Sequence, residues 1–252
     1  MGSSTAEQLR ESFVDEQIAR LEERLRREQD VPPQLLHGWV EDARGRFAGA
    51  SVTSFLPILV ERLVRARLKA GAVADAAAWA KRLLENELPR RWQHSQGVAG
   101  RAAEIARLLP RDEGQVLVVS AWLHDIGYAA EVADTGFHQL DGARYLARHG
   151  VPRRVCALVA HHAGAAAVAE LNGLSGELAE FEDERGVVRD ALWYCDMTTS
   201  PDGAHMSFDE RMAELRARRG PDDPVVRALD RNGDERAAAV RRTEEFLRRH
   251  GR

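Results

Sequence analysis

The sequence has almost no lysine and very little cysteine, and the shortage of cysteine excludes whole classes of structural site. Its basic side chains are arginine except at Lys69 and Lys81. Its two cysteines, Cys156 and Cys195, provide neither a disulfide framework nor the paired spacing of a thiolate zinc site. We therefore expect a soluble, cytoplasmic protein without structural disulfides.

Long hydrophobic runs and an excess of positive charge are also missing. No stretch of about 18 apolar residues is present, so we expect no membrane-spanning helix. The opening residues MGSSTAEQLR lack the features of a signal peptide. The formal net charge is −4 at pH 7, and the arginines are interspersed with Asp and Glu. A nucleic-acid polymer would require a basic face, so we do not expect one as a partner.

What is present favours helices. Alanine and arginine are abundant, aromatic residues make up only 6%, and the β-branched residues are mainly scattered valines. Hydrophobic residues make up 44% of the 252 positions, which is enough for a packed core. We predict an all-α fold.

Helical periodicity and proline breaks suggest the domain organisation. Val14, Ile18, Leu21 and Leu25 form one apolar stripe, and Pro89 marks a boundary. We expect five segments, which are a disordered tail (1–12), a three-helix bundle (13–70), a connecting helix (71–88), a larger helical domain (89–205) and charged C-terminal helices packed on that domain (206–252).

Histidines and aspartates fall on the apolar faces of several predicted helices. His94 lies four residues before Val98, on the buried stripe of its helix. His124 and Asp125 end the apolar run AWLHDIGY, and His161 and Asp196 lie near the inner stripes of their own helices. An unpaired buried aspartate would be costly. Imidazoles and carboxylates that point inward from different helices can instead share metal ions such as Mn, Fe, Co, Ni or Zn.

These motifs, in this order, resemble the HD superfamily of metal-dependent phosphohydrolases. The match covers about residues 79–205, through five motifs: HS at 94–95, HDIGY at 124–128, FHQLDGARYL at 137–146, HHAG at 161–164 and CDMTT at 195–199. The resemblance implies an HD-domain helical bundle over 89–205. It also implies a metal site in which His124 and Asp125 carry the catalysis.

Two further histidines, His138 and His161, resemble the branch of the superfamily that binds two metals with six ligands. On this resemblance Asp125 bridges two divalent ions. The remaining ligands divide between the ions, with His94, His124 and Asp196 on one and His138 and His161 on the other. HHAG aligns with the family through His161, whereas helical register also places His162 beside Val155, Leu158 and Val159, so the choice between His161 and His162 stays open.

Other polar residues of the motifs are candidates for supporting roles. Metal-bound histidines usually donate their second N–H to a nearby acceptor. The candidates are Tyr128, Asp141, Thr198, Thr199 and Arg144, with Ser95, Arg90 and Arg91 also considered. For each of them a helix cap, a packing role or a solvated face is an alternative. We expect Cys195 to be a packing residue.

The resemblance implies hydrolysis of a nucleotide or a related small phosphate ester, as a monoesterase or diesterase, by a metal-activated water. Two alternatives use the same fold. One is a di-iron oxygenase built on the six ligands, and the other is a sensor that binds a nucleotide without turnover. The sequence does not distinguish the hydrolase from the oxygenase.

The N-terminal segment has a resemblance of its own. Residues 46–68, RFAGASVTSFLPILVERLVRARL, resemble a small three-helix dimerisation module found ahead of phosphatase-like and arsenate-reductase-like domains. We therefore expect a homodimer formed through residues 13–70, with Phe55, Leu59 and Leu63 buried between the subunits. The alternative is a plain helical extension of the larger domain.

Overall fold

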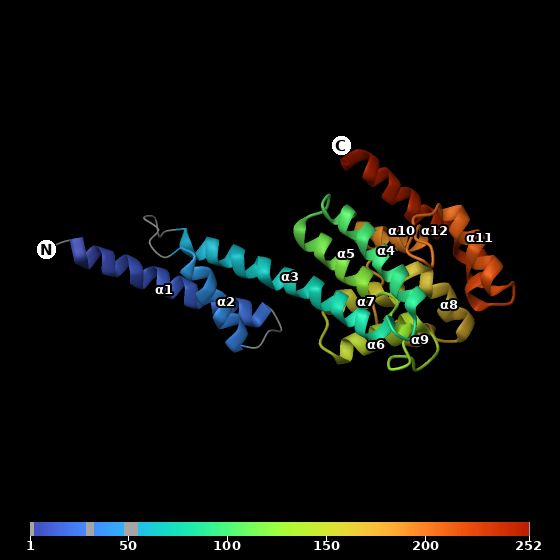
Figure 1. Ribbon diagram of the computed structural model, residues 1–252, viewed down its shortest axis with the longest axis horizontal. Helices are drawn as coiled ribbons and strands as arrows, with labels where there is room; N and C mark the ends of the chain where they lie inside the picture. The colour runs from blue at the N-terminus through green and yellow to red at the C-terminus, as the bar shows by residue number, and fades with distance from the viewer. Residues whose placement is uncertain (1–2, 29–32, 48–54, 252) are drawn as a thin grey trace. The chain divides into compact units, whose positions relative to one another are not determined.

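The computed structural model describes residues 3–28, 33–47 and 55–251, and these residues fold into helices (Figure 1). They contain one isolated antiparallel bridge, between Thr199 and His205, and no β-strand. The predicted all-α fold is confirmed. In the same described ranges no helix is both long enough and apolar enough to span a bilayer.

The chain divides into two compact units, Met1–Ala72 and Val73–Arg252. The first contains α1 (Ser3–Glu28), α2 (Pro33–Gly45) and the start of α3 (Leu56–Leu84). Its core follows the predicted stripes, and its buried residues are Val14, Ile18, Leu21, Leu25, Leu36, Val40, Ala43, Val60 and Val64. Apolar residues recur with the helical period of 3.6 on all three helices, so each helix turns one apolar face toward this core.

Two boundaries differ from those expected. The chain is helical from Ser3, where we expected a disordered tail, because the run of good helix formers extends the periodic segment backwards. The expected third helix and connecting helix are one continuous helix, α3, which passes through Gly71. A single glycine costs a helix only about 1 kcal/mol, so the alanine-rich sequence on its C-terminal side carries the helix through.

The second unit contains the end of α3 and all later helices. They are α4 (Pro89–Ala106), α5 (Arg111–Leu123), α6 (His138–Arg148), α7 (Arg153–His161), α8 (Ala165–Asn172), α9 (Ser175–Leu178), α10 (Val187–Met197), α11 (Phe208–Arg219) and α12 (Pro224–His250). Two 3₁₀ turns, Ile126–Tyr128 (η1) and His162–Gly164 (η2), interrupt this series. The short helices α8 and α9 lie in a region for which the sequence suggested no element.

The core of this unit lies between α4, α5, α7 and α10, which Figure 1 shows in green to orange. Val98 and Ala102 of α4 meet Leu117 and Ala121 of α5, and Leu192 of α10 closes the cluster. His94, His124 and Asp196 each extend one of these apolar stripes by a turn. The packing therefore gathers the ends of several helices at one place.

Candidate metal centre

His94 enters the site from the first turns of α4, a helix that begins at Pro89. Its side chain is buried, and its Nδ1 lies 3.0 Å from the carbonyl oxygen of Ser200. A carbonyl only accepts hydrogen bonds, so Nδ1 carries the proton. The other nitrogen, Nε2, faces the Asp196 carboxylate on α10 at 3.0 Å.

His124 and Asp125 stand where α5 ends, and a tight turn follows them. His124 donates from Nδ1 to the carbonyl oxygen of Ala121 at 2.7 Å, which leaves its Nε2 as the nitrogen with a lone pair. That Nε2 is completely buried and has no hydrogen-bond partner. Its nearest acidic oxygens are Oδ2 of Asp125 at 3.5 Å and Oδ1 of Asp196 at 4.0 Å.

Asp125 lies between two groups of histidines, and each of its oxygens faces one group. Oδ2 lies 3.5 Å from His124 Nε2 and 3.9 Å from His94 Nε2. Oδ1 lies 3.4 Å from His138 Nε2 and 3.7 Å from His162 Nε2. Two metal-sized clusters of ligand atoms thus share one carboxylate, which is the arrangement of a bridging ligand.

The second group of histidines comes from the start of α6 and the end of α7. His138 is the first residue of α6, and its ring stacks on Tyr128 with the centroids 3.9 Å apart. His162 donates from Nδ1 to the carbonyl oxygen of Val159 at 2.7 Å. The Nε2 atoms of His138 and His162 are 3.2 Å apart, so two ring nitrogens converge beside Asp125.

His161, which the family alignment favours as a ligand, is placed elsewhere. Its Nε2 donates to the carbonyl oxygen of Phe181 at 2.8 Å, and its own carbonyl accepts from Trp193 Nε1. Successive residues of a helix point about 100° apart, so His161 and His162 cannot both face one site. The structure brings His162 into the cluster, where the register argument also placed it, and places the His161 side chain outside it.

The supporting candidates fall mostly outside the cluster. The Asp141 carboxylate accepts from the backbone N–H groups of residues 134–136 and so orders the loop before α6. Thr198 and Thr199 donate to carbonyls one turn back in α10, and Arg144 pairs with Glu180 at the surface. Tyr128 remains in the site. The hydroxyl of Ser95 is buried without a partner, and Arg90 pairs with exposed Asp202.

Arg91 lies in the site, although we expected a solvated helix surface for it. Its Nη1 donates to Oδ2 of Asp125 at 2.8 Å, and its guanidinium lies 4.1 Å from the centre of the Tyr128 ring. The available signal was spacing, because Arg91 is three residues before His94 and therefore on the same helix face.

Burial and charge set the protonation states of the cluster. Burial lowers the pKa of His124 to about 4, against the opposing effect of Asp125 and Asp196, and it lowers the pKa of His138 well below its usual value. Burial alone would raise the pKa of Asp125, but His124 and Arg91 outweigh it and hold that pKa well below its ordinary range. His124 and His138 are therefore neutral and Asp125 ionised at pH 7, which are the forms that bind a cation.

These donors fit a divalent metal. The orphaned Nε2 of His124 needs a partner, and a buried polar atom without one costs stability. His94 directs one ring nitrogen at a carbonyl and the other at a carboxylate, although a neutral imidazole can donate only one proton. A cation between these atoms removes both conflicts. Imidazole with carboxylate is the donor set of Mn, Fe, Co, Ni and Zn.

A comparison with protein-family models adds an independent observation. The model of the HD domain matches residues 91–201, the stretch that contains His94, His124, Asp125, His138, His162 and Asp196. No curated protein and no solved structure matches the chain. Residues 91–201 of this protein are therefore an HD domain, the fold of a superfamily made up mostly of metal-dependent phosphohydrolases.

Proposed function

We propose that the protein is a metal-dependent phosphohydrolase that acts on a nucleotide or a related small phosphate ester. The observation that carries the proposal is the position of Asp125, whose two oxygens face two separate groups of histidine Nε2 atoms at 3.4–3.9 Å. A bridging carboxylate between two cation sites is the basis of two-metal hydrolysis.

The ligands divide by geometry. His94, His124 and Asp196 would hold one ion together with Oδ2 of Asp125, and His138 and His162 would hold the other together with Oδ1. Divalent ions supply Lewis acidity, polarise a phosphoryl group and lower the pKa of water that they coordinate. We expect two ions per chain.

The protein's own side chains fix the cluster in place. Three imidazoles donate from Nδ1 to backbone carbonyls, which sets their tautomers and aims every Nε2 inward. Arg91 holds Asp125 from the open side and adds positive charge next to the position of a phosphoryl group. Burial of the cluster strengthens each of these interactions because the local dielectric is low.

Metal content and hydrolysis of the untagged protein test the proposal together. We expect about two ions of Mn, Co, Ni, Zn or Fe per chain by inductively coupled plasma mass spectrometry. We also expect phosphate release from a panel of nucleotides, phosphomonoesters and phosphodiesters. Asp125→Ala removes the shared ligand and should lose both the bound metal and at least about 10³-fold of the activity.

Asp202→Ala is the matched control, because this exposed carboxylate pairs with Arg90 close to the site but does not enter it. It should keep the metal and the activity. Full activity in Asp125→Ala would contradict the proposal. Two irons with oxygen consumption and no phosphate release would identify a di-iron oxygenase instead, and a protein that never binds metal would be a binding module.

A further inference from the structure

A cavity of about 60 Å³ opens onto the metal centre, and part of its wall comes from outside the HD match. Asp125, His138 and His162 line it, together with side chains from α11 and α12. Five arginines line it, which are Arg91, Arg211, Arg218, Arg219 and Arg236.

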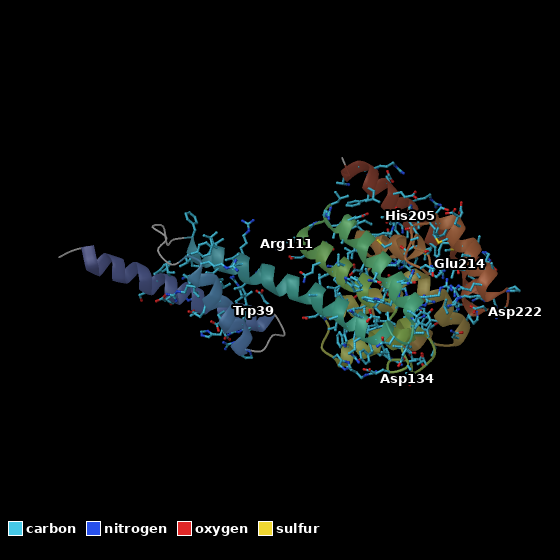
Figure 2. The ribbon with its side chains drawn as sticks, in the orientation of Figure 1. Trp39, Arg111, Asp134, His205, Glu214 and Asp222 are labelled. Carbon is cyan, nitrogen blue, oxygen red and sulfur yellow. The ribbon has the colours of Figure 1, made fainter. Side chains whose placement is uncertain are left out.

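Four of these arginines have a carboxylate partner. Arg91 pairs with Asp125 at 2.8 Å, and Arg219 pairs with Asp223 at 3.1 Å. Arg211 and Arg218 both pair with Glu214, which Figure 2 labels on α11, at 2.5 Å each. Their charges are therefore largely compensated within the protein.

Arg236 differs from the other four. It is 2% exposed, and within the described part of the chain its one hydrogen bond is a long one of 3.4 Å, from Nη2 to the carbonyl oxygen of Gly164. Its Nε is buried without a partner. Among the described residues no carboxylate lies within ion-pair distance of it. Burial lowers its pKa to about 10 against the opposing effect of the Asp196 carboxylate, so Arg236 still carries its charge at neutral pH. An unpaired buried guanidinium is costly unless a ligand compensates it.

The fold holds this guanidinium at the metal centre. Asn232 leaves helical geometry with a φ of −126°, and this kink in α12 lets its side chain donate to the Gly164 carbonyl at 3.0 Å. Gly164 ends the turn that begins at His162, and its φ is +71°. A Cβ on Gly164 would lie 2.7 Å from Arg236 Nε, so the guanidinium packs directly against the loop of a proposed metal ligand.

We infer that Arg236 binds a phosphate oxygen of the substrate, one that points away from the metals toward α12. The inference rests on the proposed function and extends it, because it assigns a substrate-binding role to a helix C-terminal to the HD match. A planar guanidinium with free N–H groups suits a phosphate better than a lysine ammonium does. The substrate class it implies is a small phosphate ester with a non-bridging oxygen free to accept from the guanidinium.

Calorimetric titration of the full-length, metal-loaded protein with inorganic phosphate tests this role. Arg236→Gln should weaken phosphate binding by at least about tenfold, and Arg236→Lys should fall between Gln and wild type. Arg231→Gln is the matched control, an arginine of the same helix that pairs with Glu170 and does not line the cavity. It should bind phosphate as the wild type does.

Asn232→Ala separates ligand binding from positioning of the loop. It removes the shorter hydrogen bond to the Gly164 carbonyl without removing a charge, so phosphate affinity should fall by less than it does in Arg236→Gln. Equal phosphate affinity in Arg236→Gln and wild type would overturn the inference, and so would an equal loss in Asn232→Ala. Absence of phosphate binding in the wild type would overturn it as well.

Failure of the inference and failure of the proposed function give different results. The proposed function fails when the wild type retains no metal or releases no phosphate from any ester. The role of Arg236 fails when phosphate binding does not depend on this side chain, whatever the metal content. Wild type and variant are compared in the same metal state, so the titration shows whether phosphate binding depends on Arg236 whatever that metal state is. A melting curve for each variant confirms that it is folded.

Discussion

At the scale of the residue, two adjacent histidines have different environments and different expected roles. His162 presents Nε2 to Asp125, whereas His161 donates to the Phe181 carbonyl and lies away from the cluster. We expect His162→Ala to lose one of the two ions and at least about 100-fold of the hydrolytic activity. His161→Ala should keep both ions and lose only stability, by about 1–3 kcal/mol, because a buried acceptor is left unpaired.

Metal analysis and a denaturant titration of both variants check this prediction. Loss of an ion in His161→Ala together with full metal in His162→Ala would reverse the assignment. The pair is informative because the two variants remove the same side chain from neighbouring positions.

At the scale of the element, the turn after α5 depends on a glycine. A Cβ at Gly127 would lie 1.8 Å from the carbonyl oxygen of His138, so η1 and the start of α6 approach each other too closely for any side chain. We expect Gly127→Ala to destabilise the protein by about 3 kcal/mol or more and to weaken metal binding, because His138 must move.

Gly100 provides the control for this change. It lies exposed inside α4, and a Cβ there would meet nothing within 4 Å. Gly100→Ala should raise the free energy of unfolding by about 0.5–1 kcal/mol through helix propensity alone. Urea titrations of both variants measure the change in the free energy of unfolding. An unchanged free energy of unfolding in Gly127→Ala would contradict the prediction and would show that η1 can shift without disturbing the site.

At the scale of the whole molecule, the first unit exposes apolar side chains that a second copy can cover. Phe55 and Ile58 are 62% and 63% exposed, whereas Leu63 packs partly against the core of its own unit. We therefore propose a homodimer formed through residues 13–70 with Phe55 and Ile58, rather than Leu63, at its centre. Burial of each such side chain stabilises an interface by about 1.5–3 kcal/mol.

Sedimentation of the full chain at micromolar concentration tests the dimer. The double variant Phe55→Ser, Ile58→Ser should sediment as a monomer with unchanged metal content. Val187→Ser, which alters a partly exposed apolar residue of the second unit, should leave the dimer intact. A wild-type protein that sediments as a monomer would contradict the proposal.

Much of the architecture follows from the sequence by itself. Apolar residues at helical spacing predict the stripe from Val14 to Leu25, the helices around His94 and Asp196, and the all-α class, because that periodicity is a local property of the chain. The same periodicity places His94, His124, Asp125 and Asp196 on inner faces, and they do lie together. Continuity of α3 was missed because a single glycine is a weak local signal.

Only the tertiary structure decided the rest. Whether His161 or His162 faces Asp125 depends on the rotation of α7 about its axis where the helix ends, which packing against α10 and the Phe181 loop sets. Arg236 is one of many arginines in the sequence, and only the kinked path of α12 leaves it buried without a carboxylate beside the cavity. Local spacing determines which face of a helix a residue occupies. Which partners that face meets depends on elements distant in the chain.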